Sequence, residues 1–162
     1  MKIRIATIAA LVASLTFASA AEIKAPNKGR IIDSVEPHAE FLVTKDKKIE
    51  IRFLDDAGKV IAPAAQVVTV TMGDRSAPTK LAFTIDGDKL VSDKVVAEGE
   101  SLPVVLQIKT TPDAKSVTEK FNLNMANCPK CSHQEYACTC DHSGEEKGHE
   151  GHTHKPGEKH DH

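Results

Sequence analysis

All four cysteines of the chain lie in one short window near its C-terminal end. They form a Cys-x-x-Cys pair, Cys128 and Cys131, followed by a Cys-x-Cys pair, Cys138 and Cys140. A thiol pair with two residues between its members can hold one ion from a tight turn, and the sulfurs of Cys-x-Cys point to the same side of an extended strand. Four thiolates at this spacing predict a small tetrahedral site for zinc, or for Cu(I), which prefers soft sulfur ligands.

Seven of the eight histidines lie in the same window or beyond it. His133 and His142 are close enough to the cysteines to replace one of them as a ligand. Neutral imidazole binds zinc, copper, nickel and cobalt ions. We therefore expect a weak, multi-site metal-binding tail, with zinc as the first expectation, formed by His149, His152, His154, His160 and His162. The alternative is a solvated terminus that only keeps the chain soluble.

Disulfide bonds are the main alternative for the cysteines. An exported chain meets an oxidising compartment, and an even number of cysteines can pair. A bond between Cys138 and Cys140 would be strained, so bridges would join one motif to the other. Two bridges within thirteen residues would close small loops and add modest stability. Thioredoxin-like chemistry is disfavoured because its Cys-x-x-Cys belongs to a βαβ unit.

The first twenty residues have the three parts of a secretory signal. Lys2 and Arg4 form a basic start, an apolar run follows, and Ala18-Ser19-Ala20 is a small-residue cleavage site. The apolar run is shorter than the about 20 residues that a membrane span needs. We predict a signal peptide over residues 1–20 and a periplasmic or secreted mature protein without a membrane anchor. Its loss of two positive charges takes the formal charge from −2 to −4, which does not favour nucleic acid as a partner.

From residue 30 to 125 the apolar side chains recur mostly at every second position, which is typical of strands. Ile49, Ile51 and Phe53, for example, alternate with Glu50 and Arg52. Turn residues such as Asp, Gly and Pro separate the runs. Short strands with one apolar face predict an all-β fold, an Ig-like antiparallel β-sandwich of about seven strands. The expected core contains Ile51, Phe53, Val70, Phe83, Leu106, Phe121 and Leu123.

The composition changes abruptly after residue 126. We predict a β-sandwich domain over residues 21–126, a Cys-rich metal-binding motif over 127–142 and a His-rich tail over 143–162. From Asp141 onward there is no aliphatic or aromatic side chain. Such a segment cannot bury apolar surface to offset its ordering entropy, so we expect it to be disordered without a ligand. Tyr136, between the two cysteine pairs, is expected to pack the motif against the sandwich.

The stretch from residue 25 to 60 resembles a known domain. It runs from Ala25-Pro26-Asn27-Lys28-Gly29-Arg30 through His38-Ala39-Glu40-Phe41 to an alternating strand and an Asp-Asp-Ala-Gly-Lys turn. The pattern is similar to the N-terminal β-sandwich domain of periplasmic adaptor subunits of RND-type heavy-metal efflux pumps, over residues 25–125. The family usually has histidine where this chain has Asn27, so no metal ligand is carried over at that position. The lipoyl, hairpin and barrel segments of a full adaptor have no counterpart, so the resemblance implies a stand-alone domain with an efflux adaptor as a partner.

These observations favour an exported metal-binding protein, a buffer or chaperone linked to heavy-metal efflux or resistance. We expect no enzyme, because the chain has no Gly-x-Ser-x-Gly, phosphate-binding glycine loop or His-Glu-x-x-His motif. His38 is expected at a strand end without a chemical role. The alternative function is a secreted, disulfide-stapled β-sandwich with a structural or interaction role. A third is an accessory domain that docks on an efflux adaptor without carrying metal.

Overall fold

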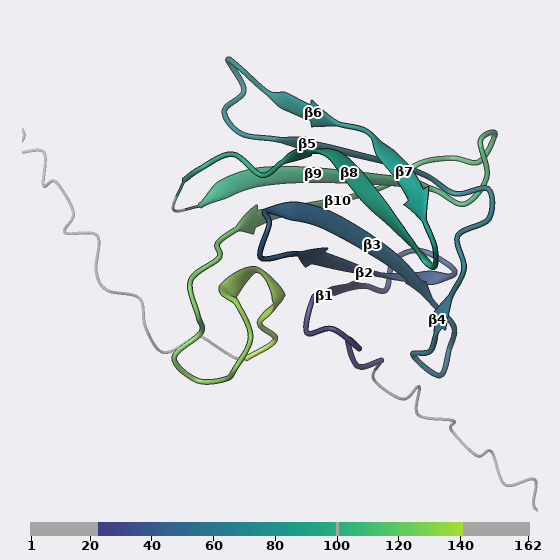
Figure 1. The fold of residues 1–162 in the computed structure, drawn as a ribbon, viewed down its shortest axis with the longest axis horizontal. Coiled ribbons are helices and arrows are strands. Elements are labelled where there is room, and N and C mark those ends of the chain that lie inside the picture. The colour runs from purple at the N-terminus through teal and green to yellow at the C-terminus, as the bar shows by residue number, and fades with distance from the viewer. Residues whose placement is uncertain (1–22, 100, 141–162) are drawn as a thin grey trace, which may run out of the picture.

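The computed structural model describes residues 23–99 and 101–140, whose strands form two antiparallel sheets packed face to face (Figure 1). One sheet, of six strands, contains β1 (Arg30–Ile32), β2 (His38–Val43), β3 (Lys48–Leu54), β4 (Val60–Ile61), β7 (Phe83–Asp86) and β8 (Lys89–Val95). The other contains β5 (Val67–Met72), β6 (Thr79–Leu81), β9 (Leu102–Lys109) and β10 (Val117–Leu123). A 3-10 turn, η1 (Glu135–Ala137), follows β10. The predicted all-β sandwich is confirmed.

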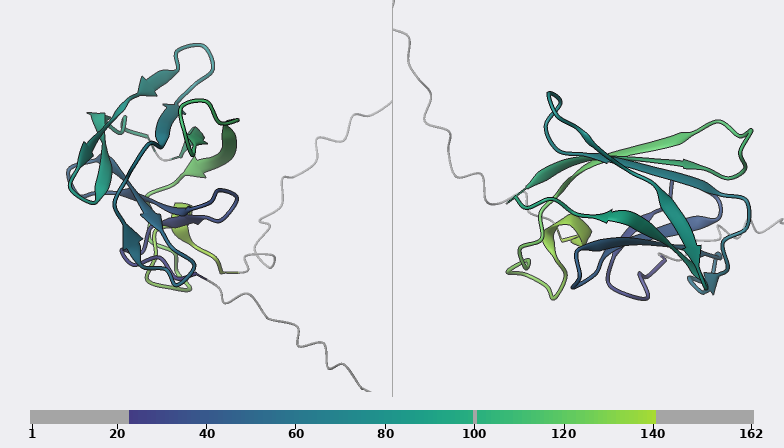
Figure 2. Two further views of the ribbon diagram at one scale, coloured as in Figure 1. Left: turned by 90° about the vertical axis from the view of Figure 1, so that its right-hand side faces the viewer. Right: turned by 45° about the horizontal axis from the view of Figure 1, so that its top comes forward.

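The order of strands in the first sheet is β1-β2-β3-β8-β7, with β4 paired to β3, and in the second sheet it is β10-β9-β5-β6. The chain passes from the second sheet to the first between β6 and β7, where only Ala82 separates the two strands (Figure 2). The described residues form ten strands rather than about seven. The difference comes from β1, β4 and β6, which are two or three residues long and too short to show an alternating pattern.

The core lies between the sheets and is aliphatic with few aromatic rings. Five of the seven expected core residues are confirmed, being at most 1% exposed: Ile51, Phe53, Val70, Leu106 and Leu123. Phe83 and Phe121 are only partly buried and pack against the margin of the core. Both stand on the outermost strand of their sheet, β7 and β10, where one side of the ring has no strand to cover it.

A buried carboxylate fastens the segment before β1 to β2. Glu40 is fully buried, and its Oε1 accepts hydrogen bonds from the backbone N–H groups of Asn27 at 2.8 Å and Gly29 at 2.9 Å. Its Oε2 accepts a third bond from the side-chain amide of Asn27 at 2.9 Å. Hydrogen bonds to a charged acceptor are stronger than neutral ones and offset the cost of burying the carboxylate. Asn27 therefore has a structural role as a donor to Glu40.

Replacing Gly29 with alanine is expected to destabilise the protein by about 1–3 kcal/mol, as overpacking does. A Cβ at this position would lie 2.5 Å from the carbonyl oxygen of Phe41 and 2.8 Å from Cγ of Glu40. Neither neighbour can move easily, because Phe41 is in the middle of β2 and Glu40 is held by its hydrogen bonds. Urea denaturation of the Gly29→Ala protein measures the loss, and an unchanged midpoint would contradict the close approach.

Candidate metal centre

After β10 the chain leaves the sandwich and loops back against it at η1 (Figure 1). We call residues 127–140 the cysteine knuckle. Backbone hydrogen bonds close its base: the N–H of Glu135 donates to the carbonyl of Ala126 at 2.9 Å, and the N–H of Tyr136 donates to that of Asn124 at 3.0 Å. Within the loop, the N–H of Cys128 donates to the carbonyl of His133 at 2.9 Å. This folding brings the first cysteine pair beside the second.

The four sulfur atoms lie within 4.8 Å of one another. The Sγ of Cys138 is 3.4 Å from that of Cys128 and 3.6 Å from that of Cys131. A tetrahedron with zinc–sulfur bonds of about 2.3 Å has edges of about 3.8 Å, so the sulfurs need little movement to surround one ion. No disulfide joins any two of the four residues in the structure, since such a bond would require sulfurs about 2.05 Å apart. Cys128, Cys131, Cys138 and Cys140 are therefore placed to hold one transition-metal ion.

The thiols of the cluster differ in pKa: that of Cys128 is lowered, whereas those of Cys138 and Cys140 are raised. Burial raises the pKa of Cys128, but hydrogen bonds from the N–H of Lys130 and from the Cys138 and Cys131 groups outweigh it and lower the pKa to about 7. The N–H of Cys140 lowers the pKa of Cys138, but burial and the neighbouring thiols outweigh it and raise the pKa to about 12. The pKa of Cys140 is also raised, because the Cys131 thiol and burial outweigh the lowering by Cys138. A thiolate on Cys128 thus starts the ligand set, and the others deprotonate as an ion binds.

Zinc binding is expected to weaken steeply as the pH falls. The raised pKa values of Cys138 and Cys140 keep both thiols protonated near pH 7 in the free site, and both must lose their protons to bind an ion. Release of at least these two protons per ion makes the apparent affinity fall about 100-fold or more for each pH unit. Competition with a chelator between about pH 6.5 and 7.5 measures this slope. A change smaller than about tenfold per unit would contradict the protonation states given above.

Tyr136 joins the knuckle to the sandwich. Its side chain is 2% exposed, and its ring meets that of Phe41 edge-on with centroids 5.9 Å apart. The N–H of Val43, at the end of β2, donates to the Tyr136 hydroxyl at 3.0 Å, and Arg30 Nη1 donates to the Tyr136 carbonyl at 3.2 Å. Burial, helped by the charge of Glu40, raises the pKa of Tyr136, so the phenol stays neutral. The expectation that Tyr136 packs the motif against the sandwich is confirmed.

Changing Tyr136 to phenylalanine is expected to lower the free energy of unfolding by about 1–3 kcal/mol, because the buried N–H of Val43 loses its acceptor. The ring would keep its contact with Phe41, so zinc affinity should change little. Thermal unfolding and zinc titration of the same variant separate the two effects. Unchanged stability would show that the hydroxyl bond does not hold the knuckle in place.

Of the other expected metal ligands, the structure describes only His133. His133 is half-buried in the knuckle, and its imidazole is not among the groups that the described residues bring within reach of one ion. His142 and the histidines from His149 onward lie outside the described residues, as do the predicted signal peptide and the predicted His-rich tail.

A second group of possible ligands, Glu36, His38 and Asp56, was not expected from the sequence. The prediction of a strand-end position for His38 is confirmed, since it is the first residue of β2. Its neighbours come from a preceding loop and from the turn after β3. The only signal for this group was the pairing of β2 with β3, which a linear pattern does not reveal.

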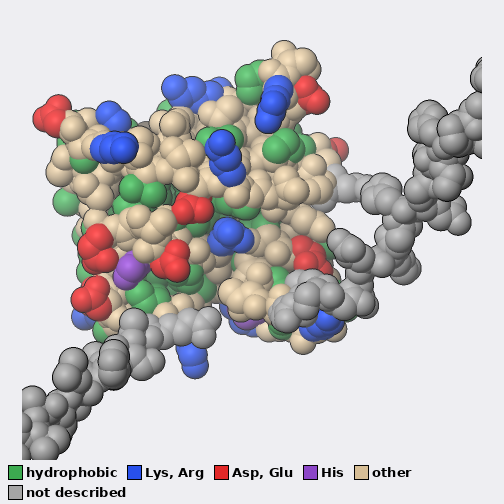
Figure 3. All heavy atoms as spheres, turned by 180° about the vertical axis from the view of Figure 1, so that it is seen from behind, with side chains coloured by type: hydrophobic (Ala, Val, Ile, Leu, Met, Phe, Trp, Pro, Cys, Tyr) green, Lys and Arg blue, Asp and Glu red, His purple; other side chains and the backbone are tan. Residues whose placement is uncertain are grey.

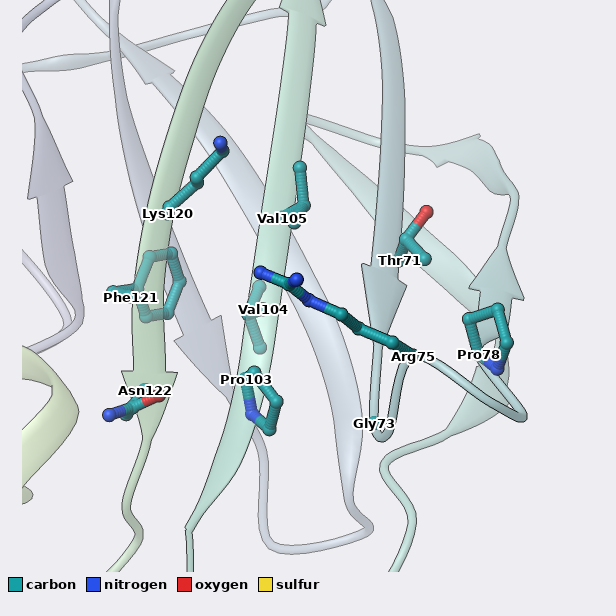
Figure 4. A pocket seen from close by; sticks show the side chains of 10 residues that line it. All are labelled: Thr71, Gly73, Arg75, Pro78, Pro103, Val104, Val105, Lys120, Phe121 and Asn122. Carbon is teal, nitrogen blue, oxygen red and sulfur yellow. The ribbon is translucent and has the colours of Figure 1, made fainter.

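A hollow of about 580 Å³ lies on the outer surface of the four-stranded sheet (Figure 4). Its charged side chains are Arg75, from the loop after β5, and Lys120, from β10. The residues that line it include no Cys, His, Asp or Glu, so they bring no metal ligand of these types. The hollow is separate from the cysteine knuckle.

Comparison with known proteins leaves the function to be argued from the site. No protein-family model, curated protein or solved structure matches the chain. The resemblance to the sandwich domain of efflux adaptors therefore stays an interpretation of the residues. Among the described residues, no helix has the length and apolar character of a membrane span.

Proposed function

We propose that the protein is exported and binds a heavy-metal ion through the four thiolates of the cysteine knuckle, as a buffer or chaperone rather than as an enzyme. The observation that carries this proposal is the convergence of four sulfur atoms within 4.8 Å of one another. Thiols this close repel one another once ionised, and a bound cation relieves that repulsion. A cluster of this kind is therefore suited to holding an ion.

The donor set narrows the class of ion. Four sulfurs at tetrahedral spacing suit Zn²⁺, and soft thiolates also suit Cu(I). Hard ions such as Mg²⁺ and Ca²⁺ require oxygen ligands and would not compete for this site. Zinc is thus the first ion to test, with copper next and nickel and cobalt after it.

The proposal gives the His-rich tail the role of a collecting arm. Its histidines would bind divalent ions weakly and raise their effective concentration near the knuckle, to which the tail is covalently joined. A link to metal efflux or resistance, with an efflux adaptor as the acceptor or donor of the ion, is supported by the resemblance of residues 25–125 to adaptor domains.

Thiol counting and metal analysis on protein taken from the exported fraction test the proposal. We expect one zinc or copper ion per chain at the knuckle and four thiols that react fully only after denaturation with a chelator. Absence of reactive thiols under denaturing conditions would instead support the disulfide-stapled alternative.

N-terminal sequencing of the same sample tests export. The sequence should begin at Ala21, or at Glu22 if cleavage falls one residue later, and a sequence that begins at Met1 would overturn export.

A further inference from the structure

A second group of metal-ligating side chains lies at the other end of β2 from the cysteine knuckle. One ligand atom each from Glu36, His38 and Asp56 lie within 4.8 Å of one another. Nε2 of His38 is 3.4 Å from Oε2 of Glu36. His38 begins β2 whereas Val43, which contacts Tyr136, ends it, so about 17 Å of extended strand separates this group from the knuckle. The two regions lie at opposite ends of the six-stranded sheet (Figure 1).

The sheet and a tight turn hold the three groups in place. His38 is paired with Leu54, the last residue of β3, and Asp56 follows two residues later. Oδ1 of Asp55 accepts hydrogen bonds from the N–H groups of Ala57 at 3.0 Å and Lys59 at 2.9 Å. The carboxylate of Asp55 therefore stabilises the turn, and that of Asp56 is left to face His38 and Glu36.

The charges around the group are not balanced by cations. In the part of the chain that the structure describes, neither Glu36 nor Asp56 forms an ion pair with Lys or Arg, whereas Glu50 on the same sheet pairs with both Arg52 and Lys89. An open hollow of about 460 Å³ borders the two carboxylates. Acidic side chains gather beside a histidine on the face shown in Figure 3. Two carboxylates that have no Lys or Arg partner and lie next to an imidazole are an environment that attracts a divalent cation.

We propose that Glu36, His38 and Asp56 form a second metal site, which binds a divalent transition-metal ion through one nitrogen and two carboxylate ligands. This donor set differs from four thiolates: it suits Mn²⁺, Co²⁺, Ni²⁺ or Zn²⁺ and disfavours Cu(I). Three protein ligands leave positions for water, and two of the three residues are exposed, so the ion binds reversibly and is open to solvent. The site does not depend on the function proposed for the knuckle.

Titration of the full-length, isotope-labelled protein with Mn²⁺, followed by paramagnetic broadening of backbone amide signals, tests this site. Mn²⁺ favours carboxylate ligands and is bound weakly by imidazole and thiolate sites compared with zinc, which limits competition from the knuckle and the tail. We expect the amides of Glu36, His38 and Asp56 to broaden at lower Mn²⁺ concentration than those of the Asp86–Gly87–Asp88 turn. If the amides of that turn broadened at the same Mn²⁺ concentration, the broadening would reflect only the general attraction of a cation to acidic loops, and the proposal would be overturned.

Variants give a second readout. His38→Gln and Asp56→Asn should each raise the Mn²⁺ concentration needed for half-maximal broadening by about tenfold or more. Asp88→Asn removes the same charge as Asp56→Asn from another exposed turn and should leave the midpoint unchanged. Amide signals elsewhere on the sandwich report whether each variant is folded, and Asp56, which is exposed, can be changed without opening the core. An unchanged midpoint in folded Asp56→Asn protein would overturn the site.

Discussion

Replacing Cys128 or Cys140 with serine is expected to weaken zinc binding by roughly 10²- to 10³-fold. Zinc sites of this kind bind with about 10–16 kcal/mol, so each of four ligands contributes about a quarter of that free energy. A serine hydroxyl remains protonated at neutral pH and is a poor replacement for a thiolate. Because one residue comes from each pair, the two variants test whether both pairs bind the same ion.

The measurement is a competition titration against a chelator, with Ser132→Ala, an exposed position of the knuckle, as a control. The control should bind zinc like the wild-type chain. The sandwich should stay folded in both cysteine variants, because neither Cys128 nor Cys140 belongs to the core cluster, to which the knuckle contributes only Tyr136 and Ala137. Equal zinc retention in wild type and both variants would assign the metal to the histidines and leave the cysteines without a metal-binding role.

Truncating Phe53 to alanine is expected to lower the free energy of unfolding by about 3–5 kcal/mol, as for a fully buried aromatic side chain. Phe53 has no exposed surface and lies on β3, an inner strand of its sheet, between Ala39 on β2 and Ile61 on β4. Its removal leaves a cavity that neighbouring strands cannot fill without distorting their pairing. Such a loss is a large part of the stability of an ordinary domain.

Phe121→Ala is the matched comparison. Phe121 is also a phenylalanine that contacts the core, with its ring 5.1 Å from that of Phe41 and the Arg30 guanidinium 4.8 Å above it. It is only partly buried on the outermost strand β10, so its loss should be clearly smaller than that of Phe53. Chemical denaturation followed by far-UV circular dichroism measures both. Equal losses of unfolding free energy in the two variants would show that the position of the strand within its sheet does not determine the size of the destabilisation.

The parts of the fold that could be predicted are those in which a side-chain pattern is local. Alternation in residues 48–54 and 102–109 marks β3 and β9 because each strand has one face toward the core. The same rule fails for β4, with two residues, and it cannot show that β3 pairs with β8, which begins thirty-five residues after β3 ends. The incomplete burial of Phe121 could not be predicted either, because a strand shows the same alternation at the edge of a sheet as in its centre. It follows from the position of β10 as the outermost strand.

The candidate site was predictable to the same extent. The spacing of Cys128, Cys131, Cys138 and Cys140 was enough to expect one thiol cluster. How closely the two pairs approach depends on the path of the intervening loop, which the hydrogen bonds at its base hold in place. The group around His38 was missed because its members meet only through the pairing of β2 with β3 and the turn that follows.

The uneven exposure of the four sulfurs has a consequence for the route by which an ion would leave. Cys128 is 4% exposed, whereas Cys131, Cys138 and Cys140 are partly open to solvent. An acceptor protein that replaces the ligands one at a time would reach the three open thiolates first and Cys128 last. The departing ion would then move outward, away from Tyr136 and the sandwich, with Cys128 as its final attachment. Delivery to an acceptor would therefore require no opening of the β-sandwich.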